Sequence, residues 1–323
     1  MRVATFNLEN LGETRASDMA VAERLDLLRP QLLRLDADVI CFQEVNAPKD
    51  PATGKRRLSP LDLLLEGTPY AGFVRCASHR PGHEEPADRH NLAIASRFPL
   101  LSCDQVFHER VPPPRHGLLR DGHDSGAVLE WERPLLHAVL GLPCGQALHV
   151  LNLHLRAPLA LALPGQKTGP FSWGSTASWA EGFLIAAIKR SGQALEARLT
   201  VDAILDEDPE ALILVAGDFN AEAAETPTRI LLASTEDTGN EALAPRALVA
   251  LERRLPAERR YSVIHGGAHV MLDHLLASPA LARRCRSLDI HNEALSDELI
   301  AFAMDSRSPE SYHAPVVATF ELA

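Results

Sequence analysis

Hydrophobic and polar residues follow two patterns along the chain. Short apolar runs rich in Val, Ile and Phe predict buried strands, and leucines that recur every three or four residues predict amphipathic helices. The predicted strands cover residues 2–8, 39–43, 91–96, 135–140, 147–153, 211–216, 271–277 and 316–321. The predicted helices cover 17–35, starting at a Ser17 cap, and 191–205. Strands and helices alternate over the whole length, as in an α/β protein.

The helical spacing also predicts which side chains face the core. In the first helix Leu25, Leu28, Leu32 and Leu35 share one face, and in the second helix Leu195, Leu199 and Ile204 are expected to point inward.

The chain is predicted to fold as one domain that spans residues 1–323. No Gly/Ser linker, shift in composition or internal repeat divides it. Three segments are expected to be loops: 76–90, 107–126 and 157–180. The last of these holds a single charged residue, Lys167, together with Trp173 and Trp179. It follows the strand that carries His154, so it is predicted to lie over a site as a lid or against a neighbouring subunit.

The composition narrows the class of protein. A hydrophobic content of 46% against 23% charged residues is enough for a large core and excludes a disordered chain. The net charge of −11 repels phosphate backbones, which argues against a protein that coats nucleic acid and makes duplex DNA a less favoured partner. Chemistry on a single phosphate stays open, because a bound cation can dominate the charge of its own site.

The cysteines and the start of the chain indicate a cytoplasmic protein. The five cysteines are widely spaced and form no CxxC pair, so we expect reduced thiols. Met1 and Arg2 lead directly into a strand pattern without the features of a secretion signal. No apolar run approaches the ~18 residues that a membrane-spanning helix needs.

Polar side chains stand at the ends of the apolar runs. Asn7, Glu44, Asn152, His154, Asp218, Asn220 and Asp273 come at or after such runs, and His313 precedes the last one. A single Asn or Asp at a strand end is usually a turn former. The whole set instead indicates a metal-assisted hydrolase, because it combines hard oxygen ligands for Mg²⁺ or Mn²⁺, donors for a phosphoryl group and a base for water.

Seven motifs resemble, in order, those of the endonuclease/exonuclease/phosphatase superfamily, the group that includes DNase I-like nucleases. They are F-N-L-E-N at 6–10, D-V-I-C-F-Q-E-V at 38–45, N-L-A-I-A-S-R-F-P at 91–99, L-N-L-H-L at 151–155, G-D-F-N-A at 217–221, L-D-H-L-L at 272–276 and S-Y-H-A-P at 311–315. The resemblance implies a four-layer α/β/β/α sandwich with two mixed β-sheets packed face to face. It also implies hydrolysis of a phosphoester with Mg²⁺ or Mn²⁺.

The resemblance further implies a role for each motif residue. It assigns Glu44, with Asn7 beside it, to the metal. Asp218 and Asn220 resemble the pair that orients water or the leaving group and holds the phosphoryl oxygen. His154 resembles the histidine that binds the phosphate. Asp273 and His313 resemble the acid/base dyad, in which the carboxylate sets the tautomer of the imidazole.

One motif departs from the family pattern. Where the family has Ser-Asp-His, this chain has Ser311-Tyr312-His313, so the auxiliary carboxylate on the metal side is missing. Asp305 or Glu310 could replace it, although an acidic residue in a surface loop is more often only solvated. The prediction is a site that holds one metal ion, or binds metal weakly.

Several weaker signals favour ordinary structural roles. The six histidines between 79 and 123 have no zinc-ligand spacing, so loop positions are favoured. The basic clusters are interleaved with acids and are expected to be solvated surface. They are Lys55 to Arg57, Arg253 with Arg254, Arg259 with Arg260 and Arg283 with Arg284. Arg133 could contact the substrate or simply lie at a strand edge.

These observations predict a metal-dependent phosphoesterase that uses water activated by the dyad of Asp273 and His313. The substrate class stays open among small phosphoesters, phospholipid head groups and nucleic-acid ends, and so does the choice between diester and monoester. The alternative is a member of the same fold that has lost catalysis and acts as a binding module, for which Tyr312 is the one favourable feature.

Overall fold

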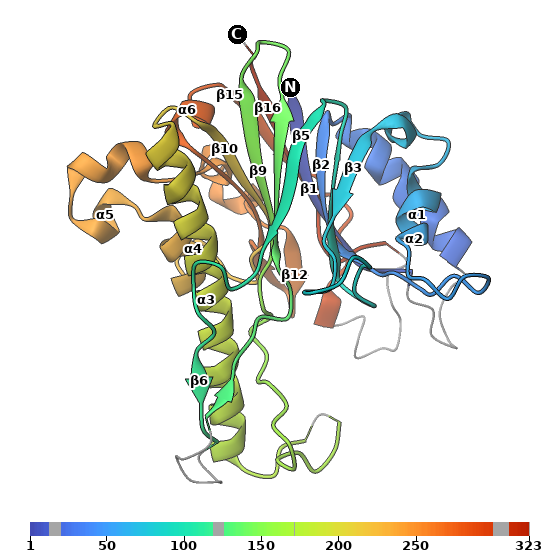
Figure 1. The fold of residues 1–323 in the computed structure, drawn as a ribbon, viewed down its shortest axis with the longest axis vertical. Coiled ribbons are helices and arrows are strands. Elements are labelled where there is room, and N and C mark those ends of the chain that lie inside the picture. Colours follow the sequence, from blue (N-terminus) through green and yellow to red (C-terminus); the bar gives the residue numbers. More distant parts are fainter. Residues whose placement is uncertain (13–20, 119–125, 171, 300–309, 323) are drawn as a thin grey trace.

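Two six-stranded mixed sheets pack face to face, and helices cover both outer faces (Figure 1). The structure is a computed structural model of the chain, and it describes residues 1–12, 21–118, 126–170, 172–299 and 310–322. The predicted α/β/β/α sandwich is confirmed. The proposed cap Ser17 lies outside the described residues.

The first sheet joins the two ends of the chain. Its strands, in spatial order, are β15 (Cys285–Ile290), β16 (Val316–Phe320), β1 (Arg2–Leu11), β2 (Val39–Val45), β4 (Asn91–Ser96) and β3 (Val74–Ala77). β1 and β2 are parallel, and β16 pairs with β1 in the antiparallel sense. Residues from the two ends of the sequence therefore lie on neighbouring strands in the middle of this sheet.

The second sheet has a matching parallel pair at its centre. Its order is β11 (Val249–Ala250), β14 (Asp273–Ala277), β10 (Leu212–Asp218), β9 (Ala147–His154), β8 (Leu135–Gly141) and β5 (Leu100–Val106). β9 and β10 are parallel, and β14 runs antiparallel to β10. Two small hairpins stand apart from the sheets: β6 (Arg115–His116) with β7 (Ala127–Val128), and β12 (Val263–His265) with β13 (Ala268–Val270).

The helices complete the outer layers. α1 (Val21–Leu35) and α2 (Ser59–Leu65) cover the first sheet, whereas α3 (Thr176–Glu207) and α4 (Thr226–Leu232) cover the second (Figure 1). The remaining helices are short: α5 (Thr235–Thr238), α6 (Pro279–Ala282), and the 3₁₀ helices η1 (Pro69–Gly72), η3 (Glu241–Arg246), η4 (Leu251–Arg254) and η5 (Ala257–Arg259). No helix among the described residues combines the length and the apolarity that crossing a membrane requires.

The alternation of side chains along each strand builds three apolar layers. Leu92 and Ile94 of β4 point between the sheets, where they meet residues such as Leu136 of β8. The four leucines predicted for one face of α1 are buried against the outer face of the first sheet. Both faces of each central strand are therefore covered, as expected for near-continuous apolar runs.

Helix α3 is longer than its sequence pattern predicted, and it is turned differently. It begins at Thr176, where the Ser175 hydroxyl accepts a hydrogen bond from the Ser178 N–H. The prediction that Leu195 points inward is wrong, because its side chain is 39% exposed. The small side chains of Ala194 and Ala197 face the second sheet instead.

An arm extends from the sandwich at the end where β9 stops (Figure 1). We define this arm as residues 155–170 and 172–192 together with the strands β6 and β7. Its own core is small and centres on Leu129, Leu163 and Ile185. The loop crosses α3 at Gly182, whose carbonyl accepts from the Leu161 N–H at 2.9 Å. A Cβ at Gly182 would lie 2.4 Å from the Leu161 oxygen, so only glycine permits this approach.

Candidate active site

The predicted site residues meet at one end of the two sheets. β9 and β10 are parallel, so their last residues, His154 and Asp218, are direct neighbours in register. Asp273 begins the antiparallel strand β14 opposite Asp218. Hydrogen bonds and close contacts link the seven predicted residues, which are Asn7, Glu44, His154, Asp218, Asn220, Asp273 and His313.

Asn7 joins the carboxylates of the two sheets. Its amide nitrogen donates to Asp218 Oδ2 at 3.0 Å and to Glu44 Oε1 at 3.3 Å. Its amide oxygen accepts from the Glu9 N–H at 2.9 Å, which fixes the orientation of the amide because an N–H can only donate. In this orientation Asn7 acts as a donor toward the centre of the site, and its role as a metal ligand stays a prediction.

The backbone is strained where it presents these groups. Glu9, Asn10, Glu44, His90 and Asn220 all have φ between 44° and 59°, the left-handed region that non-glycine residues rarely adopt. Such conformations cost about 1–3 kcal/mol each and persist only where the surroundings impose them. These strained residues lie at one end of the sandwich, where the chain leaves its strands and turns side chains toward the site.

Asp218 accepts three hydrogen bonds in a buried position. The backbone N–H and the side-chain amide of Asn220 donate at 2.8 and 3.1 Å, and Asn7 supplies the third donor. Burial raises the pKa of Asp218, and the nearby carboxylates of Asp273 and Glu44 add to this rise. Gly217 just before it has φ 140°, and a Cβ there would lie 2.0 Å from the Leu153 oxygen.

His154 is buried beside two carboxylates. Its Nε2 lies 3.4 Å from Asp218 Oδ2 and 3.7 Å from Glu44 Oε1. Burial, together with the positive charge of Arg133, holds the pKa of His154 well below its usual range. Its Nε2 faces the two carboxylates and is the ring nitrogen placed to donate a hydrogen bond into the site.

His313 and Asp273 form a dyad. His313 Nδ1 lies 2.7 Å from Asp273 Oδ2, so the opposite nitrogen, Nε2, is the one left to exchange a proton with water. Burial acts to lower the pKa of His313, but the carboxylates of Asp273, Asp218 and Glu44 outweigh it and hold that pKa well above its usual range. The Ser311 hydroxyl donates to the Asn7 carbonyl at 2.7 Å and accepts from the His313 N–H, which fixes the backbone of the dyad.

Glu9 is a site residue that the sequence argument missed. Its carboxylate accepts from the backbone N–H of Tyr312 at 3.0 Å, next to His313. Burial raises the pKa of Glu9 to about 7. It thus places a carboxylate beside the position where Tyr312 replaces the family's aspartate. The signal was the acidic residue two positions after Asn7. Of the two proposed substitutes, Asp305 lies outside the described residues, and Glu310 lines a small pocket with His313.

Arg133 belongs to the site rather than to an ordinary strand edge. Its guanidinium donates to the carbonyls of His154 and Leu155 at 3.2 and 3.3 Å. A further nitrogen lies 3.2 Å from His90 Nδ1, and His90 Nε2 lies 2.8 Å from Asn10 Oδ1. Arg133 therefore brings positive charge to the side of the site away from the dyad.

The donor set fits a hard divalent cation. Glu44, His154 and Asp218 offer ligand atoms that lie within 4.8 Å of one another, and so do Asp218, Asp273 and His313. Asp273 Oδ1 is buried and has no hydrogen-bond partner among the residues that the structure describes. Closely spaced carboxylates repel one another unless a proton or a cation lies between them, and oxygen ligands suit Mg²⁺ or Mn²⁺.

A model of the endonuclease/exonuclease/phosphatase family matches residues 4–297, which span all of these groups except His313. The chain belongs to this family. No curated protein sequence matched it.

Solved structures of this family share the fold with the chain at low sequence identity. An AP endonuclease from Archaeoglobus fulgidus is 15% identical with a TM-score of 0.55, and both chains are covered completely. The 3′ phosphatase NExo from Neisseria, bound to a product DNA hairpin, is 16% identical with a TM-score of 0.54 and the same coverage. Truncated TDP2 from Caenorhabditis elegans is 14% identical with a TM-score of 0.56, over 99% of this chain and 97% of that one.

Asn152, also singled out in the sequence, has a structural role. Its amide nitrogen donates to the carbonyls of Phe42 and Ala93 at 2.9 and 3.0 Å, and its oxygen accepts from Gln43 at 2.7 Å. These partners belong to β2 and β4, whereas Asn152 belongs to β9. The residue therefore ties the two sheets together beneath the site.

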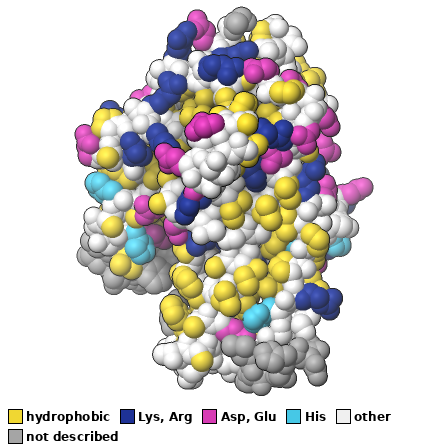
Figure 2. Space-filling model, turned by 90° about the vertical axis from the view of Figure 1, so that its left-hand side faces the viewer, with side chains coloured by type: hydrophobic (Ala, Val, Ile, Leu, Met, Phe, Trp, Pro, Cys, Tyr) yellow, Lys and Arg dark blue, Asp and Glu magenta, His cyan; other side chains and the backbone are white. Residues whose placement is uncertain are grey.

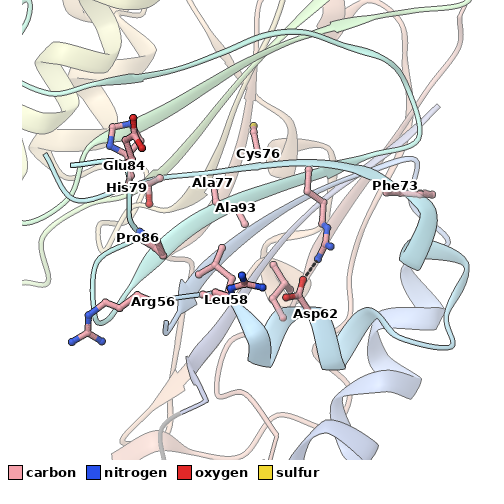
Figure 3. Close-up of a pocket in the computed structure, with 14 residues that line it drawn as sticks. Arg56, Leu58, Asp62, Phe73, Cys76, Ala77, His79, Glu84, Pro86 and Ala93 are labelled. Atoms are coloured by element: carbon pink, nitrogen blue, oxygen red, sulfur yellow. Dashed lines mark hydrogen bonds and ion pairs between the residues drawn. The ribbon is translucent and has the colours of Figure 1, made fainter. Parts of the chain in front are cut away.

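Two residues of the basic cluster at 55–57, Arg56 and Arg57, line a separate pocket of about 610 Å³ on the outer side of the first sheet (Figure 3). Arg56 pairs with Asp88, and Arg75 pairs with Asp62 at 2.6 Å. Leu58 and Phe73 are among its apolar lining. The ion pair of Arg56 with Asp88 agrees with the interpretation of this cluster as solvated surface.

His274, in the motif at 272–276, forms a buried ion pair with Glu252 that should control the stability of the fold. His274 and Glu252 are 0% and 1% exposed, and their Nδ1 and Oε1 atoms lie 2.6 Å apart. His274 Nε2 also donates to the Ala221 carbonyl, so both ring nitrogens are used. We expect His274→Ala to lower the free energy of unfolding by about 3–5 kcal/mol, because Glu252 is left as an uncompensated buried charge.

Urea unfolding would measure this effect. The control is the double variant His274→Leu with Glu252→Leu, which removes both charges and should recover most of the loss. A double variant as unstable as His274→Ala would mean that packing, and not the buried charge, sets the cost.

Proposed function

We propose that this member of the family is a divalent-metal-dependent phosphoesterase in which His313 and Asp273 activate water. The observation that carries the proposal is the 2.7 Å contact between these two residues at the edge of a cluster of carboxylates and amide donors. Because both ends of the chain contribute to this cluster, we further propose that residues 1–323 act as one catalytic unit.

Each residue has a part in the proposed hydrolysis. Glu44 and Asp218, with Asn7 beside them, would hold the metal, which when bound supplies Lewis-acid stabilisation to the phosphoryl oxygens. His313 takes a proton from the attacking water at Nε2, while Asp273 fixes the tautomer. His154 Nε2 is placed to stabilise negative charge on the phosphoryl group. Asn220, whose amide donates to Asp218 Oδ2 and to the Leu155 carbonyl, would act by orienting the Asp218 carboxylate.

Small phosphoesters and nucleic-acid ends fit this site better than long duplexes. Arg133 adds positive charge on one side of the centre, enough for a terminal or isolated phosphate. The net charge of −11 weakens attraction to an extended polyanion. Among relatives of the same fold, the Neisseria protein is described as a 3′ phosphatase bound to product DNA, which supports a nucleic-acid end as one candidate.

Hydrolysis of bis-p-nitrophenyl phosphate and p-nitrophenyl phosphate, with Mg²⁺, Mn²⁺ or a chelator, tests the proposal. We expect turnover of at least one substrate, restored by adding metal after chelation. The preferred substrate decides between diester and monoester chemistry. No turnover on a broad panel that includes 3′-phosphorylated oligonucleotides would favour a binding module that has lost catalysis.

A further inference from the structure

Helix α3 reverses the usual pattern of a surface helix along its stretch from Trp179 to Leu195. All of the charged residues in this stretch are buried: Glu181, Lys189 and Arg190. Four large apolar side chains are exposed instead: Trp179 (46%), Phe183 (40%), Leu184 (52%) and Leu195 (39%). A solvent-facing helix ordinarily shows the opposite distribution.

The buried charges hold the arm together. Glu181 lies 2.9 Å from His116 of the β6–β7 hairpin, and Lys189 lies 2.9 Å from Glu132. Arg190 donates to the carbonyl of Asn220, next to the candidate active site. These contacts turn the charged face of α3 inward, which leaves the apolar face outward.

The outward face forms one continuous row. Trp179, Phe183, Ala187, Ser191 and Leu195 are spaced by four residues, so they follow one another along the helix surface. We call these five residues the α3 row. The rings of Trp179 and Phe183 stack at 5.3 Å. On the side of the molecule drawn in Figure 2, hydrophobic side chains gather over the lower part, with few charged ones among them.

We propose that the α3 row is the interface of a homodimer, in which α3 of a second copy crosses it in the antiparallel sense. Rows of residues spaced by four are the ridges that interlock when two helices pack. A two-fold axis at Ala187 places Phe183 of each copy against Ser191 of the other, and Trp179 against Leu195. Large side chains then meet smaller ones, and the small Ala187 lies at the closest approach. A symmetric interface requires this self-complementarity.

The exposed apolar area is of the size that an interface needs at its centre. The four large side chains leave on the order of 400 Å² of apolar surface open on one helix, a size within the range of the largest apolar patches of proteins, which are often functional. A stable dimer buries roughly 800 Å² per partner.

The charge pattern favours a second copy over a lipid surface. An anionic membrane attracts basic side chains around the apolar contact, but both basic residues between Trp179 and Leu195 are buried. The whole chain, at −11, is repelled by anionic lipid. The row also runs lengthwise along the helix over several turns, a geometry that suits another helix.

Sedimentation velocity over a range of protein concentrations tests the dimer. We expect the full chain to sediment at twice its monomer mass of 35.2 kDa. Leu184→Glu, at a 52% exposed residue directly beside Phe183 of the α3 row, should raise the dissociation constant at least ~30-fold. The matched control is Leu101→Glu on β5, whose side chain is 62% exposed outside the α3 row and whose substitution should leave the dimer unchanged. Circular dichroism checks that each variant is folded.

A cross-link tests the position of the axis. In a Cys144→Ser background, which removes the exposed native thiol, Ala187→Cys should give a disulfide-linked dimer under mild oxidation. A wild-type protein that stays monomeric at all concentrations overturns the proposal. So does a dimer that Leu184→Glu leaves intact. Binding of monomeric protein to phosphatidylcholine vesicles, with a shift in tryptophan fluorescence, would assign the row to a lipid surface instead.

Discussion

His313→Ala is expected to lower kcat by about 10²–10⁴-fold with little change in KM, because positioned general bases contribute a factor of this size. The side chain is mostly buried against Asp273, and its Nδ1 is already engaged at 2.7 Å. The substitution removes the group that takes the proton from water and leaves the carboxylate cluster in place. Steady-state hydrolysis of the better nitrophenyl ester measures the loss.

Asp273→Asn keeps the His313 imidazole and removes the charge of its partner, so it tests the contribution of Asp273 by itself. In the wild-type protein the carboxylates keep the pKa of His313 well above its usual range, so the fraction of neutral base, and with it the rate, rises as the pH increases. Without the Asp273 charge this pKa falls, and the remaining activity should begin to rise at lower pH. His265→Ala, on an exposed hairpin, is the matched control and should keep wild-type rates. Near-normal turnover of His313→Ala would remove the dyad from the mechanism.

The sequence predicts the strands that carry the site residues, because these strands depend on local patterns of apolar residues. Apolar runs such as 91–96 are long enough to specify strands, and the polar residues that follow them mark strand ends. Parallel pairing of β9 with β10 then brings His154 and Asp218 together without further information. The family motifs add Asn7 and His313, which lie near opposite ends of the chain. They come into the same site because β1 pairs with β16 in the first sheet.

What the sequence hides depends on tertiary contacts. The register of α3 could not be read from its leucines, because buried ion pairs such as that of Lys189 with Glu132 turn its charged face inward. The role of Glu9 could not be predicted, because it depends on a contact with the Tyr312 backbone, more than 300 residues away in the sequence. The orientation of the Asn7 amide is likewise set by a backbone N–H that no sequence pattern reveals.

Glu44→Gln is expected to have the second large effect, at the metal. Glu44 Oε2 accepts from the Asn10 N–H at 2.9 Å, which leaves Oε1 facing Asn7 and His154. The amide keeps the shape of the side chain but removes the negative charge that would hold a hard cation. Loss of several kcal/mol of charge stabilisation corresponds to roughly 10²–10⁴ in rate. We expect that loss together with weaker Mn²⁺ binding in calorimetric titration.

Glu9→Gln gives the comparison that locates the metal. Tyr312 takes the place of the family's auxiliary aspartate, and the Glu9 carboxylate lies next to it. If Glu9 replaces that aspartate, its amide variant should weaken Mn²⁺ binding, though less than Glu44→Gln does, because Glu44 contacts both Asn7 and His154. The titration of the wild-type protein should reveal one tight site. Two tight Mg²⁺ or Mn²⁺ sites would contradict the one-metal prediction, and a Glu44→Gln variant that binds Mn²⁺ normally would move the ligand role to Asp218 and its neighbours.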